Sequence, residues 1–312
     1  MKSVATITMN PAIDVSTTVD RMTPVHKLRC ASAQRDPGGG GINVARVVQK
    51  LGGDVTAVFP LGGATGQLLR RMVENEGIRS STFEVRDETR LSFTVLESET
   101  GHEYRFVLAG PPLSEPEWQQ GFEELKRLPG RLDFLVMSGS LPQGVPDDFY
   151  ARVARMAKVR GTKVVLDTSG PALLAALQEG MYLIKPNLRE LRELTGQALM
   201  DERSWLEACR ALVDTGQAEV VALTLGDLGA LLVSRDAAVR APALPIEPVS
   251  TVGAGDSFLG AMVWALAAGQ GLAEAFRYGV AAGSAALITP GTELCHRDDV
   301  ERLHGQVIVQ SI

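Results

Sequence analysis

Cysteine and histidine are scarce in this sequence of 312 residues. The three cysteines, Cys30, Cys209 and Cys295, are far apart and odd in number, and the four histidines are equally scattered. This distribution disfavours a disulfide framework, a Cys-x-x-Cys metal site and an HExxH metalloprotease helix. Separated thiols of this kind are typical of a reducing compartment, so we expect a cytoplasmic protein.

Long apolar runs and dense clusters of Lys and Arg are also missing. The most apolar window, residues 257–268, is shorter than the ~20 residues that a membrane helix needs. Residues 1–11 lack the basic segment and apolar stretch of a signal peptide. A formal net charge of −6 gives no general attraction to nucleic acid. We therefore expect neither a membrane nor a nucleic acid as partner.

Apolar residues are plentiful, at 45% of the chain, and they follow a regular order. Strand-like runs are expected at 4–9, 55–59, 134–137, 163–167, 182–185, 220–224 and 230–233, and helical patterns near 42–51, 67–76, 147–159, 188–194 and 203–214. This alternation predicts an α/β fold with a mostly parallel central sheet and helices on both faces. Functional loops are then expected at the carboxyl ends of the strands.

Two segments interrupt this order, residues 14–34 and 90–107. Both are rich in Thr, Val, Ser and charged residues, and Glu99-Thr100-Gly101 is typical of a hairpin turn. We predict that they form antiparallel strands that project from the main sheet as a small β lid, with insertion boundaries of about 13–36 and 89–108. An ordinary loop excursion is the alternative. Because no Ser/Gly-rich linker is present, we expect a single domain over residues 1–312.

The most informative motif is a tight turn followed by a carboxylate, Gly253-Ala254-Gly255-Asp256, directly before an apolar helical stretch. A turn that leads into a helix directs unpaired backbone N–H groups and the positive dipole end at one point, which favours an anion. The amides could hold charge on a transferring phosphoryl group while Asp256 takes a proton from an attacking hydroxyl. The alternative is that Asp256 only caps the helix.

Four consecutive glycines, Gly38, Gly39, Gly40 and Gly41, precede Asn43 at the start of another expected helix. Glycine lets a substrate lie against bare backbone, with the Asn43 amide available to bind a hydroxyl group. A flexible hinge is the alternative, and the two roles are compatible. Neither glycine motif matches a Walker A loop or the dinucleotide pattern Gly-x-Gly-x-x-Gly, which disfavours a P-loop ATPase and a dehydrogenase.

Weaker signals concern a nucleotide. Asn187 and Glu190 stand three apart after an expected strand, where they suit either magnesium carried by a nucleotide or a helix-capping pair. The turn from Thr224 to Gly229, which includes Gly226, could bind phosphates through backbone amides.

The proposed lid carries the cations Arg90 and Arg105, with Lys27 and Arg29. Arginine suits bidentate capture of phosphate. Taken singly, each of these cations could equally lie on a solvated strand face.

Together these motifs resemble the PfkB, or ribokinase-like, carbohydrate kinases. Gly39–Ala45 and Thr251–Asp256 are similar to the two signatures of that family, in the same order, and Asn187-x-x-Glu190 is similar to its metal-associated motif. The resemblance covers essentially the whole chain and implies a ribokinase-like fold. Within that family, the chain is most similar to the bacterial ATP-dependent 6-phosphofructokinases in residues 8–11 with Asp14 and in segments 26–30, 37–46, 59–66, 104–107, 138–142 and 280–286.

This resemblance implies a role for individual residues. Fructose 6-phosphate would be held by Asp14, Gly38, Gly39, Gly40, Gly41, Asn43, Arg90, Arg105 and Ser140. ATP would be contacted by Lys185, Asn187, Thr224, Gly226, Gly229 and Ser284, with Glu190 ordering Mg²⁺ through water. Asp256 would be the catalytic base, beside an anion hole formed by Gly253, Ala254 and Gly255. Lys27 would contribute to a second, inhibitory ATP site.

The resemblance also implies a potassium site and a homodimer. The K⁺ site would be formed by Ser250, Val252, Ala286, Thr289 and Gly291. In that segment the chain departs from the family pattern, because Thr289 and Glu293 stand in place of an asparagine and an arginine. Backbone carbonyls remain able to coordinate a cation there. The lid of such kinases serves as the dimer interface, which implies a homodimer here.

The expected reaction is therefore ATP-dependent phosphorylation of the C1 hydroxyl of fructose 6-phosphate. Tagatose-6-phosphate kinase and 1-phosphofructokinase are alternatives, since the configuration of one sugar hydroxyl cannot be inferred from these residues. Tyr104-Arg105-Phe106 and the four-glycine segment favour the 6-phosphate. A non-catalytic sugar-phosphate sensor is an alternative of another class, although a sensor has no need of the base Asp256.

Overall fold

The main sheet has ten strands in the computed structural model, which describes residues 2–312. They are β1 (Val4–Ile7), β4 (Val55–Gly62), β5 (Arg79–Val85), β8 (Phe134–Ser138), β9 (Lys163–Asp167), β10 (Met181–Ile184), β11 (Ala218–Thr224), β12 (Ala230–Ser234), β13 (Ala238–Ala241) and β14 (Gln310–Ser311). Their order is β14-β13-β12-β11-β10-β9-β8-β1-β4-β5. The strands from β11 to β5 are parallel, and β12, β13 and β14 add an antiparallel edge. This confirms the mostly parallel sheet.

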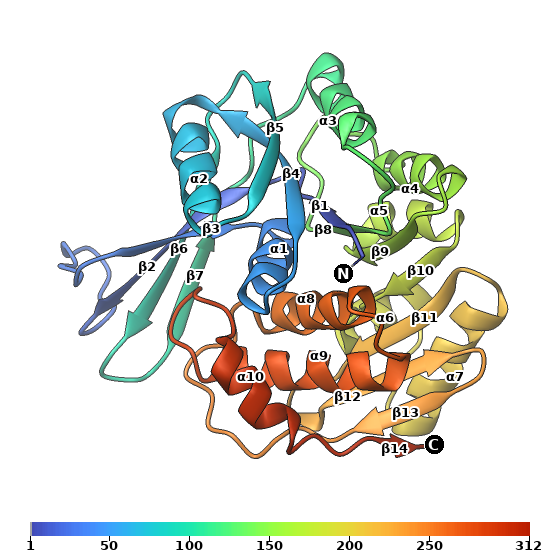
Figure 1. The fold of residues 1–312 in the computed structure, drawn as a ribbon. Helices are drawn as coiled ribbons and strands as arrows, with labels where there is room; N and C mark the ends of the chain where they lie inside the picture. Colours follow the sequence, from blue (N-terminus) through green and yellow to red (C-terminus); the bar gives the residue numbers. More distant parts are fainter. Residues whose placement is uncertain (1) are drawn as a thin grey trace.

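Helices cover both faces of this sheet, as the sequence predicts (Figure 1). One face carries α1 (Gly40–Lys50), α2 (Gly63–Asn75), α8 (Ala254–Ala267), α9 (Leu272–Leu287) and α10 (Arg297–His304). The other carries α3 (Glu115–Arg127), α4 (Phe149–Val159), α5 (Gly170–Leu177), α6 (Leu188–Thr195) and α7 (Glu202–Asp214), and a short 3-10 helix spans Gly226–Leu228. Along β8, Phe134 and Val136 join the first core while Leu135 and Met137 join the second, as strand alternation requires.

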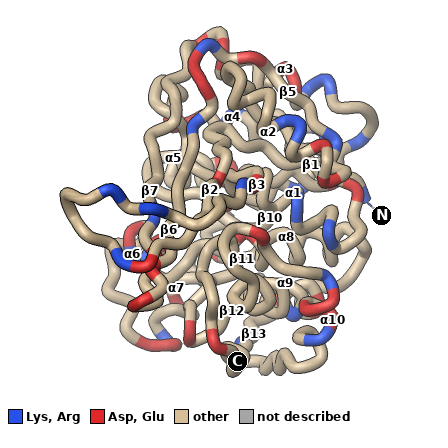
Figure 2. The backbone as a smooth tube through the Cα atoms, turned by 90° about the vertical axis from the view of Figure 1, so that its left-hand side faces the viewer, with Lys and Arg blue, Asp and Glu red and all other residues tan. Residues whose placement is uncertain are grey.

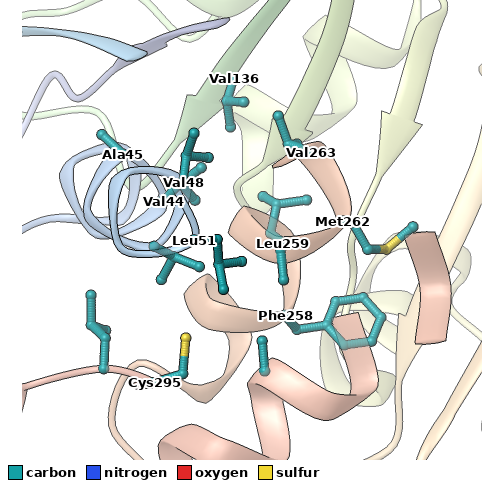
Figure 3. Close-up of a cluster of buried hydrophobic side chains, with 14 of the residues drawn as sticks. Val44, Ala45, Val48, Leu51, Val136, Phe258, Leu259, Met262, Val263 and Cys295 are labelled. Atoms are coloured by element: carbon teal, nitrogen blue, oxygen red, sulfur yellow. The ribbon is translucent and has the colours of Figure 1, made fainter. Parts of the chain in front are cut away.

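Close packing of α1 against α8 determines where the two glycine motifs lie. Figure 3 shows Val44 and Val48 of α1 facing Leu259 and Val263 of α8. A Cβ atom at Gly260 would lie 2.7 Å from the Val47 side chain and 3.1 Å from the Val44 carbonyl oxygen, so only glycine permits this approach. The first turns of α1 and α8 are thereby brought side by side.

A second sheet projects from the first, to the left in Figure 1, and forms the lid. It consists of β2 (Ala12–Val19), β3 (Gln34–Gly38), β6 (Arg90–Glu97) and β7 (Glu103–Val107), in the order β3-β2-β6-β7. The antiparallel prediction is correct for the outer pairs and wrong for the central pair, since β2 and β6 run parallel. The reason is that β2 and β6 follow β1 and β5, which already point the same way in the main sheet.

Acidic and basic residues alternate along the chain rather than gathering in one basic segment. Figure 2 shows acidic and basic segments interspersed along the backbone, and the formal net charge is −6. Among residues 2–312, none of the helices combines the length and the apolar character that crossing a membrane demands.

Candidate active site

Asp256 lies in the first turn of α8, whose N-cap Gly253 has a left-handed φ of 74°. Such a backbone favours glycine, because a side chain there would be strained. Asn43, in the first turn of α1, donates a 2.8 Å hydrogen bond from Nδ2 to Asp256 Oδ2. The structure therefore joins the two glycine motifs, which are far apart in sequence, through one hydrogen bond between their polar side chains.

The environment of Asp256 suits a proton acceptor. Burial raises the pKa of its carboxyl group, and the Asn43 hydrogen bond and the positive charge of Lys185 only partly oppose this effect. A carboxylate with a raised pKa holds a proton more readily than an ordinary aspartate. The positive end of the α8 dipole and the free amides of its first turn lie at the same place.

A cavity of about 180 Å³ opens between Asp256 and the lid. Its walls are Ala12, Asp14, Gly39, Gly40, Asn43, Arg90, Ser92, Phe93, Thr94, Arg105, Val107, Val252, Gly253, Asp256 and Thr292. Polar and charged groups thus face one small space from both the lid and the main domain. Ser92, Thr94 and Thr292 were not predicted, although Ser92 and Thr94 follow Arg90 at the strand period of two.

Arg90 contributes a positive charge to the cavity wall, and its guanidinium group retains an unpaired hydrogen-bond donor. Its Nη1 donates to the Leu108 carbonyl at 2.8 Å and its Nη2 to the Asn10 carbonyl at 3.1 Å. Its Nε is buried and finds no acceptor within the described residues. An unpaired buried donor of this kind is suited to an anion such as phosphate.

Asp14 faces the same space. Burial raises the pKa of the Asp14 carboxyl group, while Arg105 and Arg90 pull it down. This carboxylate therefore lies among the lid cations and can accept hydrogen bonds from sugar hydroxyls.

The four glycines end β3 and begin α1, which does not support a flexible hinge. A Cβ at Gly38 would collide with the Asp14 carboxylate, and one at Gly40 would collide with Ser138 Oγ. Gly39 has a φ of 110°, which strains any residue with a side chain. Bare backbone is therefore needed here for the close approach of neighbouring groups.

Among the residues predicted to contact a nucleotide, Lys185 follows β10, and its Nζ lies 3.2 Å from Asp167 Oδ1 at the end of β9. Burial raises the pKa of Asp167 to about 6, with Lys185 opposing the shift and Asp256 and Glu190 adding to it. These three carboxylates hold the pKa of Lys185 above its usual value despite its burial. The excess of negative charge around one ammonium group fits a divalent cation.

Asp167 was missed by the sequence analysis. The signal was available, because it is the last residue of the predicted strand 163–167, at the carboxyl end where functional groups gather in such sheets. Its contact with Lys185 depends on the pairing of β9 with β10, which the sequence does not show.

Asn187 and Glu190 form a reciprocal capping pair at the start of α6. Asn187 N donates to Glu190 Oε2 at 2.9 Å, and Glu190 N donates to Asn187 Oδ1 at 2.9 Å. The capping alternative is therefore present in the structure. It leaves Glu190 Oε1 and Asn187 Nδ2 for other partners, so capping and a role toward magnesium are compatible.

The predicted phosphate turn lies beside this cap. Thr224 N donates to the Pro186 carbonyl at 3.0 Å, and Gly226 and Gly229 have φ angles of 62° and 95°. Ser284 is buried on α9. Lys185, Asn187 and Thr224 thus stand at the ends of the adjacent strands β10 and β11.

Three of the predicted sugar-binding residues, Gly38, Gly41 and Ser140, are not among the cavity walls, and neither is Lys27. Gly41 packs instead against Thr8 and Ile7. Ser140 accepts a 3.1 Å hydrogen bond from Asn10 Nδ2 and is not among the cavity residues, whereas Ser138 packs against Gly40. Lys27 is exposed in the loop that joins β2 to β3.

The segments predicted to hold potassium run side by side. The amides of Val249 and Ser250 both donate to the Leu287 carbonyl, at 2.7 and 3.2 Å. Ser250 Oγ also donates to Glu103 of the lid strand β7 at 3.1 Å. Carbonyl and carboxylate oxygens therefore gather near Ser250, and a hard cation prefers such ligands.

The chain is similar to known proteins over nearly its whole length. The pattern of the pfkB family carbohydrate kinases matches residues 2–299. The chain is 47% identical to ATP-dependent 6-phosphofructokinase isozyme 2 of Mycobacterium tuberculosis strain H37Rv, over 96% of this chain and 88% of that protein. It is 33% identical to a 1-phosphofructokinase of Bacillus subtilis, over 92% of this chain and 94% of that protein.

Solved structures agree with these relatives. The crystal structure of phosphofructokinase-2 from Escherichia coli in complex with fructose-6-phosphate superposes with a TM-score of 0.92 at 38% identity, covering 98% of this chain and 99% of that one. The structure of the same protein in complex with potassium superposes with a TM-score of 0.94 at 40% identity, with the same coverage.

Proposed function

This chain belongs to the pfkB family of carbohydrate kinases, and from that membership we propose that it transfers the γ-phosphoryl group of ATP to the C1 hydroxyl of fructose 6-phosphate. The products are fructose 1,6-bisphosphate and ADP. The observation that carries the proposal is the Asn43–Asp256 hydrogen bond beside a cavity whose other wall holds Arg90 and Arg105. A base and a phosphate anchor then face opposite ends of one small sugar.

The lid binds the non-reacting end of the sugar. Arg90 and Arg105 anchor the 6-phosphate, with the free Arg90 Nε as one donor. Asp14 and Asn43 orient the ring hydroxyls. Fixing the sugar in this way supplies much of the rate, because phosphoryl transfer depends mostly on position and charge.

Asp256 then accepts the proton of the C1 hydroxyl as its oxygen attacks the γ-phosphorus. The amides of Gly253, Ala254 and Gly255 and the dipole of α8 stabilise the charge that spreads over the phosphoryl oxygens. Lys185 adds a positive charge on the same side. Its Nζ lies close to Gly255, where a Cβ atom would be only 3.3 Å away. The ADP product keeps the bridging oxygen of the broken bond.

The cations belong to the proposal as well. We propose that Glu190 and Asp167, whose negative charges both act on Lys185, would order magnesium, which would neutralise phosphate charge during transfer. For potassium we propose the oxygens of Ser250, Val252, Ala286, Thr289 and Gly291.

The lid also provides the surface for a homodimer. Phe106 and Val107 of the edge strand β7 and Leu108 directly after it are 45%, 61% and 48% exposed, and this apolar edge has no neighbouring strand. We propose that two copies join through their lids, and that the enzyme acts in the cytoplasm.

The test is ATP consumption with Mg²⁺ on fructose 6-phosphate, tagatose 6-phosphate and fructose 1-phosphate, with kcat/KM compared in parallel. We expect a clear preference for fructose 6-phosphate. Preference for either other sugar would keep the mechanism and overturn the substrate. Sugar-phosphate binding without turnover on any of them would favour the sensor.

A further inference from the structure

A cluster of polar side chains adjoins the sugar cavity, buried at Asp36, Arg46 and Thr292 and more open at its edge. It includes groups with no role in the mechanism above. At its centre is Arg46, one helical turn after Asn43 on α1 and only 2% exposed. Arg46 Nε donates to both oxygens of Glu76 at 2.9 and 3.0 Å, and Nη1 donates to the Pro37 and Thr292 carbonyls at 3.0 and 3.2 Å. Nη2 lies 3.4 Å from Asp36 Oδ1.

Two further contacts join the lid strand β3 directly to the loop between α9 and α10. Thr292 Oγ1 donates to Asp36 Oδ2 at 2.6 Å, and Gln34 Nε2 donates to Glu293 Oε1 at 2.9 Å. From α1, Lys50 Nζ donates to the Glu293 carbonyl at 2.5 Å. We call the six side chains Gln34, Asp36, Arg46, Lys50, Thr292 and Glu293 the latch.

The spacing of these residues matches the elements that carry them. Gln34 and Asp36 are two apart on one face of β3, and Arg46 and Lys50 are four apart on one face of α1. Thr292 and Glu293 are consecutive in the loop. The latch therefore connects the lid, α1 and the loop twice. Asp36, Arg46 and Thr292 make the first set of contacts, and Gln34, Lys50 and Glu293 make the second.

Stability alone gives weak grounds for such a cluster. A buried arginine with carboxylate partners often stabilises no better than apolar side chains of similar volume, because desolvation offsets the attraction. The guanidinium group of Arg46 instead supplies a fixed geometry, because its N–H donors point in set directions within one plane.

The groups that this geometry fixes are those of the active site. Arg46 shares α1 with Asn43, the hydrogen-bond donor to Asp256. Thr292 lines the sugar cavity together with Asp256. On the lid side, Asp36 stands two residues before Gly38, which packs against the Asp14 carboxylate.

We propose that Arg46 is a positioning residue, and that the latch couples the lid to Asp256 so that sugar binding and alignment of the base occur together. This inference rests on the proposed function for its substrate. A lid that moves without the latch would bind the sugar while leaving Asn43 and Thr292 out of place.

The test is a double-mutant cycle of Asp36→Asn and Thr292→Val, read as kcat and KM for fructose 6-phosphate. We expect each single variant to lower kcat/KM and the double variant to add little, with a coupling of about 5-fold or more. Additive effects would overturn the coupling and would leave Thr292 as a residue that acts on the sugar by itself.

Thr162→Val is the matched control. Thr162 is 5% exposed, close to the 4% of Thr292, and it also loses one buried hydrogen bond, from Oγ1 to the Leu132 carbonyl at 2.8 Å. We expect a lowered melting temperature in both Thr→Val variants and lowered kcat only in Thr292→Val. An equal kinetic effect in Thr162→Val would show that the latch is merely structural.

Arg46→Lys tests the centre of the latch, because it keeps the charge and loses the fork of donors. Backbone hydrogen exchange with fructose 6-phosphate alone then measures coupling without turnover. In the unmodified protein we expect sugar binding to slow exchange both at 34–38 and at 289–293. In Arg46→Lys we expect slowing at 34–38 only.

The two failures are distinguishable. If the unmodified protein phosphorylates fructose 6-phosphate while 289–293 exchanges at the same rate with and without sugar, the latch inference fails alone. If the protein turns over none of the three sugar phosphates, the proposed function fails. In that case, backbone hydrogen exchange is measured with whichever sugar phosphate binds. Slower exchange at 34–38 without slower exchange at 289–293 would then overturn the latch inference.

Discussion

At the scale of single residues, the position of Asp256 combines two opposing effects on one carboxyl group. Burial raises its pKa and the Asn43 hydrogen bond lowers it. A base that is too acidic would not hold the C1 proton, and one that is too basic would already be protonated. Burial outweighs the hydrogen bond, so the pKa of Asp256 lies above that of an ordinary aspartate, which favours its proposed role as a proton acceptor.

Replacing the base tests this role directly. We expect Asp256→Asn to fold normally and to lose roughly 10²–10⁴-fold in kcat, the usual contribution of a positioned base. Steady-state kinetics with a melting curve on the same sample checks both parts. Turnover close to that of the unmodified protein would rule out Asp256 as the base.

Replacing the hydrogen-bond donor Asn43 should change the pKa of Asp256 in a known direction. Asn43→Ala removes a bond to the charged form of Asp256, so the pKa of that carboxyl group rises further. Because the base must be unprotonated, we expect the acid limb of the kcat/KM profile against pH to move to higher pH. A profile whose acid limb does not move would show that another group titrates.

At the scale of elements, the start of α6 separates a capping role from a metal role. Asn187→Ala removes the cap, and we expect a loss of about 0.5–2 kcal/mol in the free energy of unfolding. Glu190→Gln keeps an oxygen to accept from Asn187 N and removes only the charge.

For Glu190→Gln we therefore expect an almost unchanged melting temperature and about a 10–100-fold higher Mg²⁺ requirement. A titration of activity against Mg²⁺ at fixed ATP measures this. If the requirement stays constant while the melting temperature drops, Glu190 serves the helix and has no part in metal binding.

The glycine segment at the end of β3 allows a similar comparison. Gly38→Ala would push the Asp14 carboxylate from its place, and we expect kcat/KM for the sugar phosphate to fall by up to about 10²-fold. Gly271→Ala is the control, since Gly271 has a φ of −71° and open space around it. Kinetics that respond equally to both substitutions would contradict the close-approach argument.

Elements with a local pattern were predictable, and those that depend on distant partners were not. The strands at 134–137 and 163–167 and the helix at 147–159 carry their period in their own residues. β5 is paired only on one side and reads RSSTFEV, too polar to indicate a strand. α9 is rich in small Ala and Gly residues, Gly279 and Gly283 among them, so no single apolar face stands out.

The same distinction applies to the site. Asp256 and Asn43 lie in motifs with a turn and a helix start, so their chemistry could be inferred locally. Asp167 and Arg46 became meaningful only through neighbours brought by the fold, Lys185 for the first and Asp36 for the second. The parallel pairing of β2 with β6 was hidden for the same reason.

At the scale of the whole molecule, the lid edge predicts the assembly. Phe106 is exposed on β7, next to Arg105 and Val107 of the cavity. If the lids form the proposed homodimer interface, we expect Phe106→Glu to yield a monomer, because a carboxylate would be buried without a partner at that interface. Sedimentation velocity measures this.

Val159→Glu is the matched control. Val159 is 86% exposed on α4, away from the lid sheet, and we expect this variant to sediment like the unmodified protein. A monomer in both the unmodified protein and Phe106→Glu would remove the lid interface from the proposal.

The parallel pairing of β2 with β6 also affects the order in which parts of the molecule fold. A parallel pair cannot be closed by a short turn, and here the intervening chain includes β3, α1, β4, α2 and β5. Contacts between such distant segments form late, since much loop entropy is lost before they are made. During synthesis, the lid wall of the proposed sugar site is therefore completed only after the chain has passed β7. The surface proposed to bind the substrate is then among the last parts of the amino-terminal half to fold.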